Sequence, residues 1–174
     1  MAKRKISIKR FTIIYILLML PLVILLWYKP VADSFRFNAY YSNTITFLTA
    51  KTMELLGVYV RYSGSLIRAG SVGLDVQFGC NGLEAVMIYV IAVISFPGKT
   101  IKKIIGIVAG FFVIQVLNLL RIMGLVYTAM HFQKVFEIMH LYVAQGIMIA
   151  VALGIFIFYL KYINTQDEDG QTAG

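Results

Sequence analysis

Four long apolar runs constrain this chain more than any other feature. They cover residues 11–28, 79–96, 104–127 and 141–160, and 60% of the 174 residues are hydrophobic. A soluble domain of this length has too little interior to bury so much apolar side chain, so lipid must be the solvent for much of it. A helix needs about 20 apolar residues to cross a bilayer. The sequence therefore predicts an all-α integral membrane protein with about four transmembrane helices.

The first run is predicted to be a retained membrane span. A cleaved signal peptide has a shorter apolar region that ends in small residues. This run instead ends in WYKP, where Trp27 and Tyr28 are placed to anchor at the interface. Residues 1–10, which are rich in lysine and arginine, are then a basic cytoplasmic N-terminus.

The segment 29–78 is mixed in composition and is predicted to lie outside the cytoplasm. Residues 31–56 carry apolar and aromatic side chains at roughly helical spacing, which indicates one or two interfacial amphipathic helices. From residue 57 the pattern alternates between glycines, which favours a small β-sheet with strands near 58–62, 65–68 and 74–78. An irregular loop is the alternative.

The remaining runs complete one integral membrane domain over residues 11–163, followed by a polar tail, 164–174, that is expected to be disordered. The run 79–96 is the weakest of the four spans, because it is short and contains Glu84.

The basic residues set the predicted orientation. With the N-terminus inside, nine lie on the cytoplasmic side in short segments, and six lie outside in a much longer one. The inner set is Lys3, Arg4, Lys5, Lys9, Arg10, Lys99, Lys102, Lys103 and Lys161, and the outer set is Lys29, Arg36, Lys51, Arg61, Arg68 and Lys134. This bias predicts that both termini are cytoplasmic. The net charge of +8 is weak support for nucleic-acid binding, because the basic residues flank apolar runs.

Cys80 is the only cysteine, so no intramolecular disulfide can form. Asn81 is a candidate N-cap for the following helix, with Glu84 three residues later as in a capping box. A thiol at a helix N-terminus is expected to have a lowered pKa, although a nearby carboxylate such as Glu84 opposes this effect. Gly79 and Gly82 allow another backbone, such as a substrate peptide, to approach closely. A buried structural cysteine is an equally open interpretation.

Arg121 lies inside the third run, six residues from its outer end, or about 9 Å along a helix. A charge within a span normally faces a polar interior, and Asn118 and Gln115 share its helix face. Snorkelling to the headgroups, or a structural ion pair with Glu84, is the alternative.

Two histidines compete for a role as proton carrier. His140 begins the fourth run at the outer boundary, and His131 lies in the preceding linker. One cysteine and two histidines without an HExxH pattern do not make a metal set, so the sequence predicts neither a metal site nor a cofactor.

The segments FGCNGLEAV, NLLRIMGLVY and FEIMHLYVAQG, in this order, resemble the exosortase/archaeosortase family, and most of all its short exosortase H type. The family pattern maps onto Cys80 with Gly82 and Leu83, onto Asn118 with Arg121, and onto His140. The resemblance covers about residues 55–160. The chain departs from the pattern in having Asn81 where serine is frequent, and in lacking the additional N-terminal spans of many members.

The resemblance implies a membrane cysteine protease or transpeptidase of the bacterial inner membrane, with its site facing outward. Its substrates would be exported proteins with a C-terminal tail of recognition motif, transmembrane helix and basic cluster. Cys80 would form a thioester, His140 would move protons, and Arg121 would stabilise the oxyanion or orient the thiolate. Asn81, Gly82, Glu84, Asn118 and His131 are the predicted supporting residues.

Two other functions stay open. One is a non-catalytic membrane subunit that binds the transmembrane tail of a partner, and the other is a transporter component with Arg121 and Glu84 along its pathway. The transporter is less favoured because the spans have no clear internal repeat. A homo-oligomer or an accessory subunit is compatible with each function.

Overall fold

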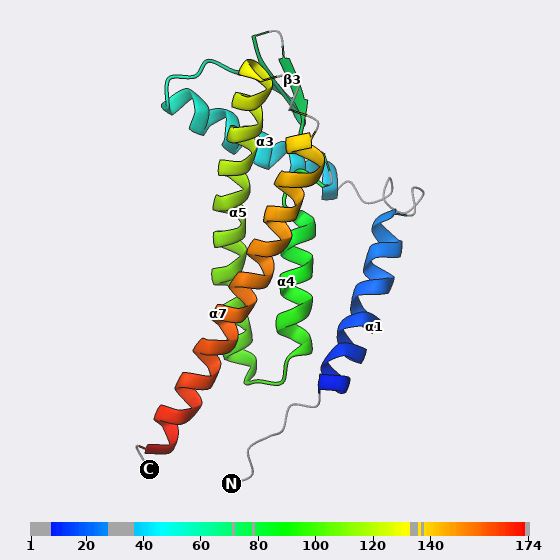
Figure 1. Ribbon diagram of the computed structural model, residues 1–174, viewed down its shortest axis with the longest axis vertical. Helices are drawn as coiled ribbons and strands as arrows, with labels where there is room; N and C mark the ends of the chain where they lie inside the picture. The colour runs from blue at the N-terminus through cyan, green and yellow to red at the C-terminus, as the bar shows by residue number, and fades with distance from the viewer. Residues whose placement is uncertain are drawn as a thin grey trace.

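The computed structural model describes residues 8–27, 37–70, 72–77, 79–132, 136 and 138–172, and it is mostly helical. Four helices run along the long axis of the molecule, and a fifth, α3, lies across one end (Figure 1). We call the end at α3 the upper end. The start of α1 and the end of α7 lie at the lower end. The lengthwise helices are α1 (Ile8–Trp27), α4 (Leu83–Ser95), α5 (Thr100–His131) and α7 (Ala144–Thr172), and α3 spans Phe37–Leu55.

Two of the described helices, α5 and α7, are long and apolar enough to cross a membrane. Helix α4 is apolar but has only 13 residues. It is shorter than the predicted span 79–96 because Gly79 and Gly82 have positive φ angles of 91° and 80°, which place them in a turn before the helix. Helix α1 covers most of the first predicted run and begins three residues earlier, at Ile8.

The predicted extracytoplasmic segment contains α3 and a three-stranded antiparallel sheet in the order β1-β2-β3. The register places Tyr62 opposite Ile67 and Ile67 opposite Leu74, and the last two are buried beneath the sheet. The strands are shifted by one to three residues from the predicted ones, and residues 31–36 of the predicted helical stretch lie outside the described residues. The strands are β1 (Arg61–Ser63), β2 (Leu66–Ala69) and β3 (Val72–Asp75).

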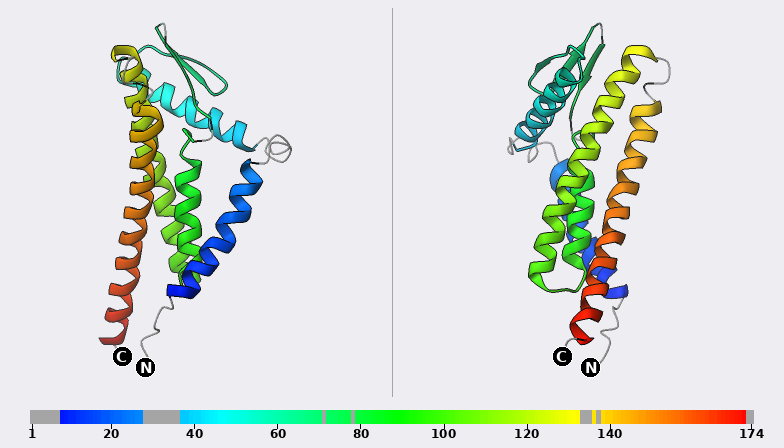
Figure 2. Two further views of the ribbon diagram at one scale, coloured as in Figure 1. Left: turned by 45° about the vertical axis from the view of Figure 1, so that its right-hand side comes forward. Right: turned by 90° about the vertical axis from the view of Figure 1, so that its left-hand side faces the viewer.

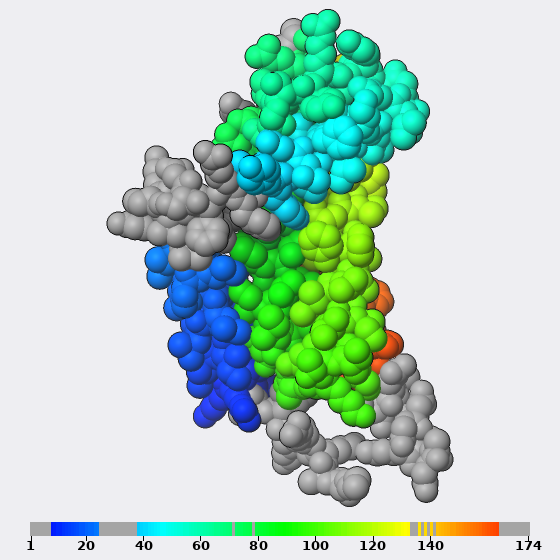
Figure 3. Space-filling view, turned by 180° about the vertical axis from the view of Figure 1, so that it is seen from behind, coloured from blue at the N-terminus to red at the C-terminus, as the bar shows by residue number. Residues whose placement is uncertain are grey.

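Buried side chains form two separate clusters. The upper cluster joins α3, the sheet and the upper part of α5, and the lower cluster joins α4, α5 and α7. Figure 2 shows that α3 and the sheet lie beside the upper part of α5, which reaches the level of the sheet, and Figure 3 shows α3 and the sheet at the upper end of the molecule. The upper cluster includes Ile45, Met53, Ile67, Leu74, Val76, Cys80, Ile122, Leu125, Val126 and Ala144, and the lower cluster includes Ala85, Val86, Tyr89, Val93, Ile114, Met148, Ala152 and Tyr159.

Two glycines of α5 allow tyrosine rings to approach its backbone in the lower cluster. A Cβ atom on Gly110 would lie 2.2 Å from the Tyr89 ring, and one on Gly106 would lie 2.4 Å from the Tyr159 ring. The Tyr89 hydroxyl donates a hydrogen bond of 2.7 Å to the Gly106 carbonyl. Close packing of this kind is how helices associate where lipid removes most of the hydrophobic driving force.

Helix α7 continues to Thr172, whereas the sequence predicted a disordered tail from residue 164. Extending an established helix adds one hydrogen bond for each residue that is fixed, which favours continuation from the long apolar part of α7.

Candidate active site

A tight turn carries the chain from β3 into α4 and positions Cys80. The backbone N–H groups of Cys80 and Asn81 both donate to the carbonyl of Gln77, at 2.8 Å and 3.0 Å. Gly79 and Gly82 flank the cysteine with positive φ angles, which a residue with a Cβ atom adopts only with strain. The two glycines therefore have a conformational role on either side of the thiol.

The Cys80 side chain is buried, with 3% of its surface exposed, and it belongs to the upper cluster. Burial raises the pKa of the Cys80 thiol, the positive charge of Arg121 lowers it, and the carboxylate of Asp75 raises it further. The net direction is upward, so the sequence-based expectation of a lowered pKa is wrong. The expected helix N-terminus effect is outweighed because the thiol is removed from water.

Asn81 ties this turn to α3. Its side-chain Oδ1 accepts the backbone N–H of Leu83 at 3.0 Å, and its Nδ2 donates to Asn38 Oδ1 and to Ser42 Oγ, both at 2.9 Å. The residue before α4 is Gly82 rather than Asn81, and the predicted capping box with Glu84 does not form. Asn81 still satisfies a backbone donor at the start of α4, because its amide reaches one residue past the glycine.

Arg121 reaches from α5 to the same turn. Its Nη2 donates to the carbonyl of Gly79 at 3.2 Å, and its Nη1 lies 3.5 Å from Asn118 Oδ1. Within the described ranges, its buried Nε has no hydrogen-bond partner, and neither has the buried Nδ2 of Asn118. Because α5 extends to His131, Arg121 lies ten residues from the end of the helix, or about 15 Å, rather than six residues from the end of the predicted run.

His140 lies on a short π-helix, Met139–Val143, immediately before α7. Its ring stacks on Phe136 with centroids 5.6 Å apart, and its buried Nδ1 has no hydrogen-bond partner among the residues that the structure describes. Burial lowers the pKa of His140, and the charge of Arg121 lowers it further. The imidazole is therefore neutral at pH 7 and able to accept a proton.

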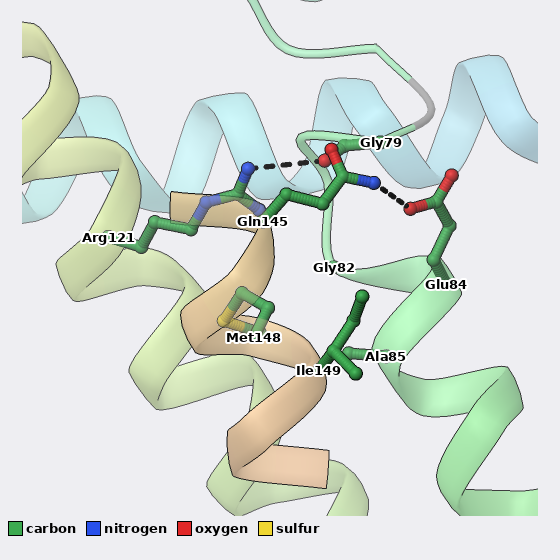
Figure 4. A pocket seen from close by; sticks show the side chains of 8 residues that line it. All are labelled: Gly79, Gly82, Glu84, Ala85, Arg121, Gln145, Met148 and Ile149. Carbon is green, nitrogen blue, oxygen red and sulfur yellow. Dashed lines mark hydrogen bonds between the residues drawn. The ribbon is translucent and has the colours of Figure 1, made fainter. Parts of the chain in front are cut away.

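A pocket of about 250 Å³, counting its open mouth, lies between α4, α5 and α7 beside this turn (Figure 4). Gln145 Nε2 donates to Glu84 Oε2 at 2.7 Å across it. The lining residues do not include Cys80, although the two glycines that flank it are among them. The residues that line the pocket are Gly79, Gly82, Glu84, Ala85, Arg121, Gln145, Met148 and Ile149.

The structure thus brings Cys80, Arg121 and His140 to one end of the helices from a turn, α5 and the π-helix. A comparison with known families gives a match to the transmembrane exosortase model over residues 4–159, which include all three side chains. The chain belongs to the transmembrane exosortase family. No match was found among curated proteins or among solved structures.

His131 is separate from the site of this exosortase. Its ring is exposed at the end of α5 and stacks on the Tyr127 ring, with centroids 4.4 Å apart. Its Nδ1 lies 3.1 Å from the carbonyl oxygen of Tyr127. It is ten residues beyond Arg121 on the same helix, so the structure does not place it with the other predicted residues.

Gln145 of this exosortase is a pocket residue that was not predicted from the sequence. The side chain lines the pocket and contacts Glu84. A signal was present, because Gln145 is the only amide side chain in the apolar run 141–160, and polar side chains within spans are rare and usually face a protein interior.

Proposed function

We propose that this exosortase is a membrane cysteine protease or transpeptidase that cleaves the C-terminal sorting signal of exported proteins. The observation that carries the proposal is the position of Arg121. Its guanidinium is hydrogen-bonded to the carbonyl preceding Cys80, and its charge acts on both the Cys80 thiol and the His140 imidazole. Family membership independently supports this class of reaction.

In the proposed reaction, His140 accepts the thiol proton and the Cys80 sulfur attacks the scissile carbonyl carbon. The carbonyl electrons move onto oxygen, where the Arg121 guanidinium stabilises the charge. Collapse of this intermediate breaks the peptide C–N bond, His140 returns the proton to the leaving amine, and a thioester remains. Water or an acceptor amine then releases the product.

Neutral His140 fits this role because its Nδ1 is buried and finds no hydrogen-bond partner in the described part of the chain. The raised pKa of the buried Cys80 favours the thiol at rest, so the thiolate would form when a substrate is present.

The proposed orientation places the upper end outside the bacterial inner membrane and both termini in the cytoplasm. Lys9 and Arg10 lie in the first turn of α1, and Lys102 and Lys103 lie in the first turn of α5, so all four belong to the lower end. This agrees with the bias of basic residues toward the cytoplasm. The partner would be an exported protein whose transmembrane tail carries the recognition motif to the upper end.

The burial of Cys80 favours a second candidate function. A thiol that is 3% exposed and absent from the pocket lining suits a non-catalytic subunit that holds the transmembrane tail of a partner. In that case Arg121 and Gln145 would serve recognition, and the cysteine would be replaceable.

The decisive experiment is coexpression with a reporter that ends in a sorting tail, followed by measurement of tail removal. Cys80→Ser is expected to abolish cleavage, and His140→Ala to slow it by about 100-fold or more. His131→Ala is the matched control and should cleave like the wild type, because its ring is exposed away from the site. Wild-type cleavage by Cys80→Ser would reject the enzyme, and retained capture of the tail by that variant would then support the binding subunit.

A further inference from the structure

Two opposite charges share the pocket beside Cys80 without pairing. Arg121 and Glu84 both line the pocket, and each is only partly exposed. Both belong to the described part of the chain, and no ion pair forms between them there. In a partly buried site, opposite charges attract more strongly than in water. The other contacts of the two side chains therefore bear on whether they pair.

Gln145 is placed to hold the Glu84 carboxylate away from the guanidinium. Its Nε2 donates to Glu84 Oε2 at 2.7 Å, a charge-assisted bond of good length. Figure 4 shows the Gln145 side chain between Arg121 and Glu84. Gln145 belongs to the first turn of α7, which begins at Ala144 directly after the π-helix of His140, so its position is set by a helix rather than by a loop.

The hydrogen bond between Gln145 and Glu84 leaves Arg121 directed at the turn that holds Cys80. Its only recorded hydrogen bonds among the described residues are to the Gly79 carbonyl and to Asn118, and its Nε has no partner. If Arg121 paired with Glu84 instead, its charge would be largely cancelled at the thiol.

We propose that Gln145 is a positioning residue that holds the Glu84 carboxylate away from Arg121, so that the guanidinium stays available to Cys80 and to the reacting carbonyl. The availability to Cys80 is a property of the site itself. The effect on turnover rests on the proposed function.

The test uses the full-length protein in detergent and reads the ionisation of Cys80. This is the only cysteine of the chain, so alkylation by iodoacetamide reports on it alone. The charged and titratable groups that bear on this site are Asp75 from β3, Arg121 from α5, Glu84 from α4 and His140 from the π-helix. The alkylation rate is measured against pH, and the midpoint gives the apparent pKa of the thiol.

Gln145→Leu removes the donor while keeping a similar volume. The expected result is a midpoint raised by about one pH unit, because Arg121 moves to Glu84 and no longer favours the thiolate. Adding Glu84→Gln to this variant should return the midpoint to the wild-type value, since no carboxylate is left to capture Arg121. This rescue is the outcome that a merely structural role of Gln145 would not produce.

Ile147→Ala is the matched control, because Ile147 lies two residues along α7 with an exposed side chain. It should leave the midpoint unchanged. A Gln145→Leu variant that alkylates faster at every pH with the same midpoint has loosened the turn, and this result would overturn the proposal. So would an unchanged profile, or a double variant with the same raised midpoint. If Gln145→Leu does not accumulate, Gln145→Asn gives the same comparison, because its shorter amide cannot reach Glu84 from the same position.

Tail cleavage supplies the second readout. Gln145→Leu should lower kcat about 10-fold with little change in KM, and Glu84→Gln should recover most of the loss in the double variant. If the wild type cleaves no tail, the proposed function fails, but the alkylation midpoints still decide the role of Gln145. If cleavage is found and the midpoints do not move, only the role of Gln145 is rejected.

Discussion

The upper and lower clusters differ in how many buried polar atoms lack a hydrogen-bond partner and in how closely their side chains pack. Four of the six buried polar atoms without a hydrogen-bond partner among the described residues lie near the upper cluster, on Gln115, Asn118, Arg121 and His140. The lower cluster is mainly apolar and closely packed, with tyrosine rings seated on glycines of α5. The upper region therefore leaves polar groups available, and the lower region provides a rigid base.

This difference suggests that the two regions should respond differently to substitution. Unpaired buried polar groups cost stability and are retained mainly where they serve a function, whereas close packing contributes stability directly. Changes in the upper region should then affect activity more than stability, and changes in the lower region should do the reverse.

The largest expected effect is on the activity of Arg121→Ala. Loss of one oxyanion-stabilising donor typically costs 100-fold to 1,000-fold in rate, and we expect tail cleavage to fall by about this factor. The apparent Tm in detergent should change little. Arg68→Ala, an exposed arginine on β2, is the control for loss of a cation and should retain activity. An Arg121→Ala protein that unfolds readily but still cleaves would contradict the expectation that changes in the upper region affect activity more than stability.

Gly110→Ala should have the largest effect on stability. The added methyl group would lie 2.2 Å from the Tyr89 ring, and overpacking of this kind costs about 1–3 kcal/mol. The apparent Tm should fall. Gly154→Ala on α7 is the matched control, because no atom lies within 4 Å of its added Cβ, and it should be neutral or slightly stabilising. Equal Tm values for the two variants would contradict the close packing of α4 on α5.

Two tyrosine hydroxyls of the lower cluster offer a finer comparison. Tyr89→Phe removes the hydrogen bond to the Gly106 carbonyl and should cost about 1 kcal/mol. Tyr159→Phe removes a buried hydroxyl that has no hydrogen-bond partner among the residues described, so it should be neutral or stabilising. Thermal unfolding of both variants in the same detergent tests the difference, and a larger loss for Tyr159→Phe would refute it.

The smallest expected effect is a pH dependence of stability that comes from His140. Burial and Arg121 lower its folded-state pKa below the usual 6.5, so the unfolded chain takes up a proton first as the pH falls. Stability should therefore decrease with falling pH below 6.5 and recover as the pH rises. The apparent Tm between about pH 7.5 and about pH 5.5 should fall more steeply for the wild type than for His140→Gln.

The helices could be predicted from the sequence for a simple reason, because helix α5, for example, follows from a long apolar run. Cys80 stands at the start of one run, Arg121 within the next and His140 just before the last, so an up-and-down arrangement predicts all three near the outer ends of the helices. Placing three side chains at one end needs only the direction of each helix, which the order of the runs supplies.

Contacts between distant residues could not be predicted. Asn81 and its partner Asn38 are 43 residues apart, and Gln145 and Glu84 are 61 residues apart. Such hydrogen bonds depend on how helices rotate and tilt against one another, which the apolar pattern does not specify. For the same reason the sequence left a buried and a reactive Cys80 equally open, because burial depends on the packing of the upper cluster and not on neighbours in sequence.

The short length of α4 has a consequence for where the chemistry would occur. Its 13 residues extend about 20 Å, whereas the hydrocarbon core of a bilayer is about 30 Å thick. Alongside α5 and α7, the turn that holds Cys80 would therefore sit below the water surface, or the bilayer would thin around it. Backbone that is not helical is tolerated at such depth only where protein satisfies it, and here Gln77, Asn81 and Arg121 supply partners for the turn. In the proposed reaction, the substrate tail would then enter sideways from the lipid, and water or an amine would have to be delivered to that depth to release the product.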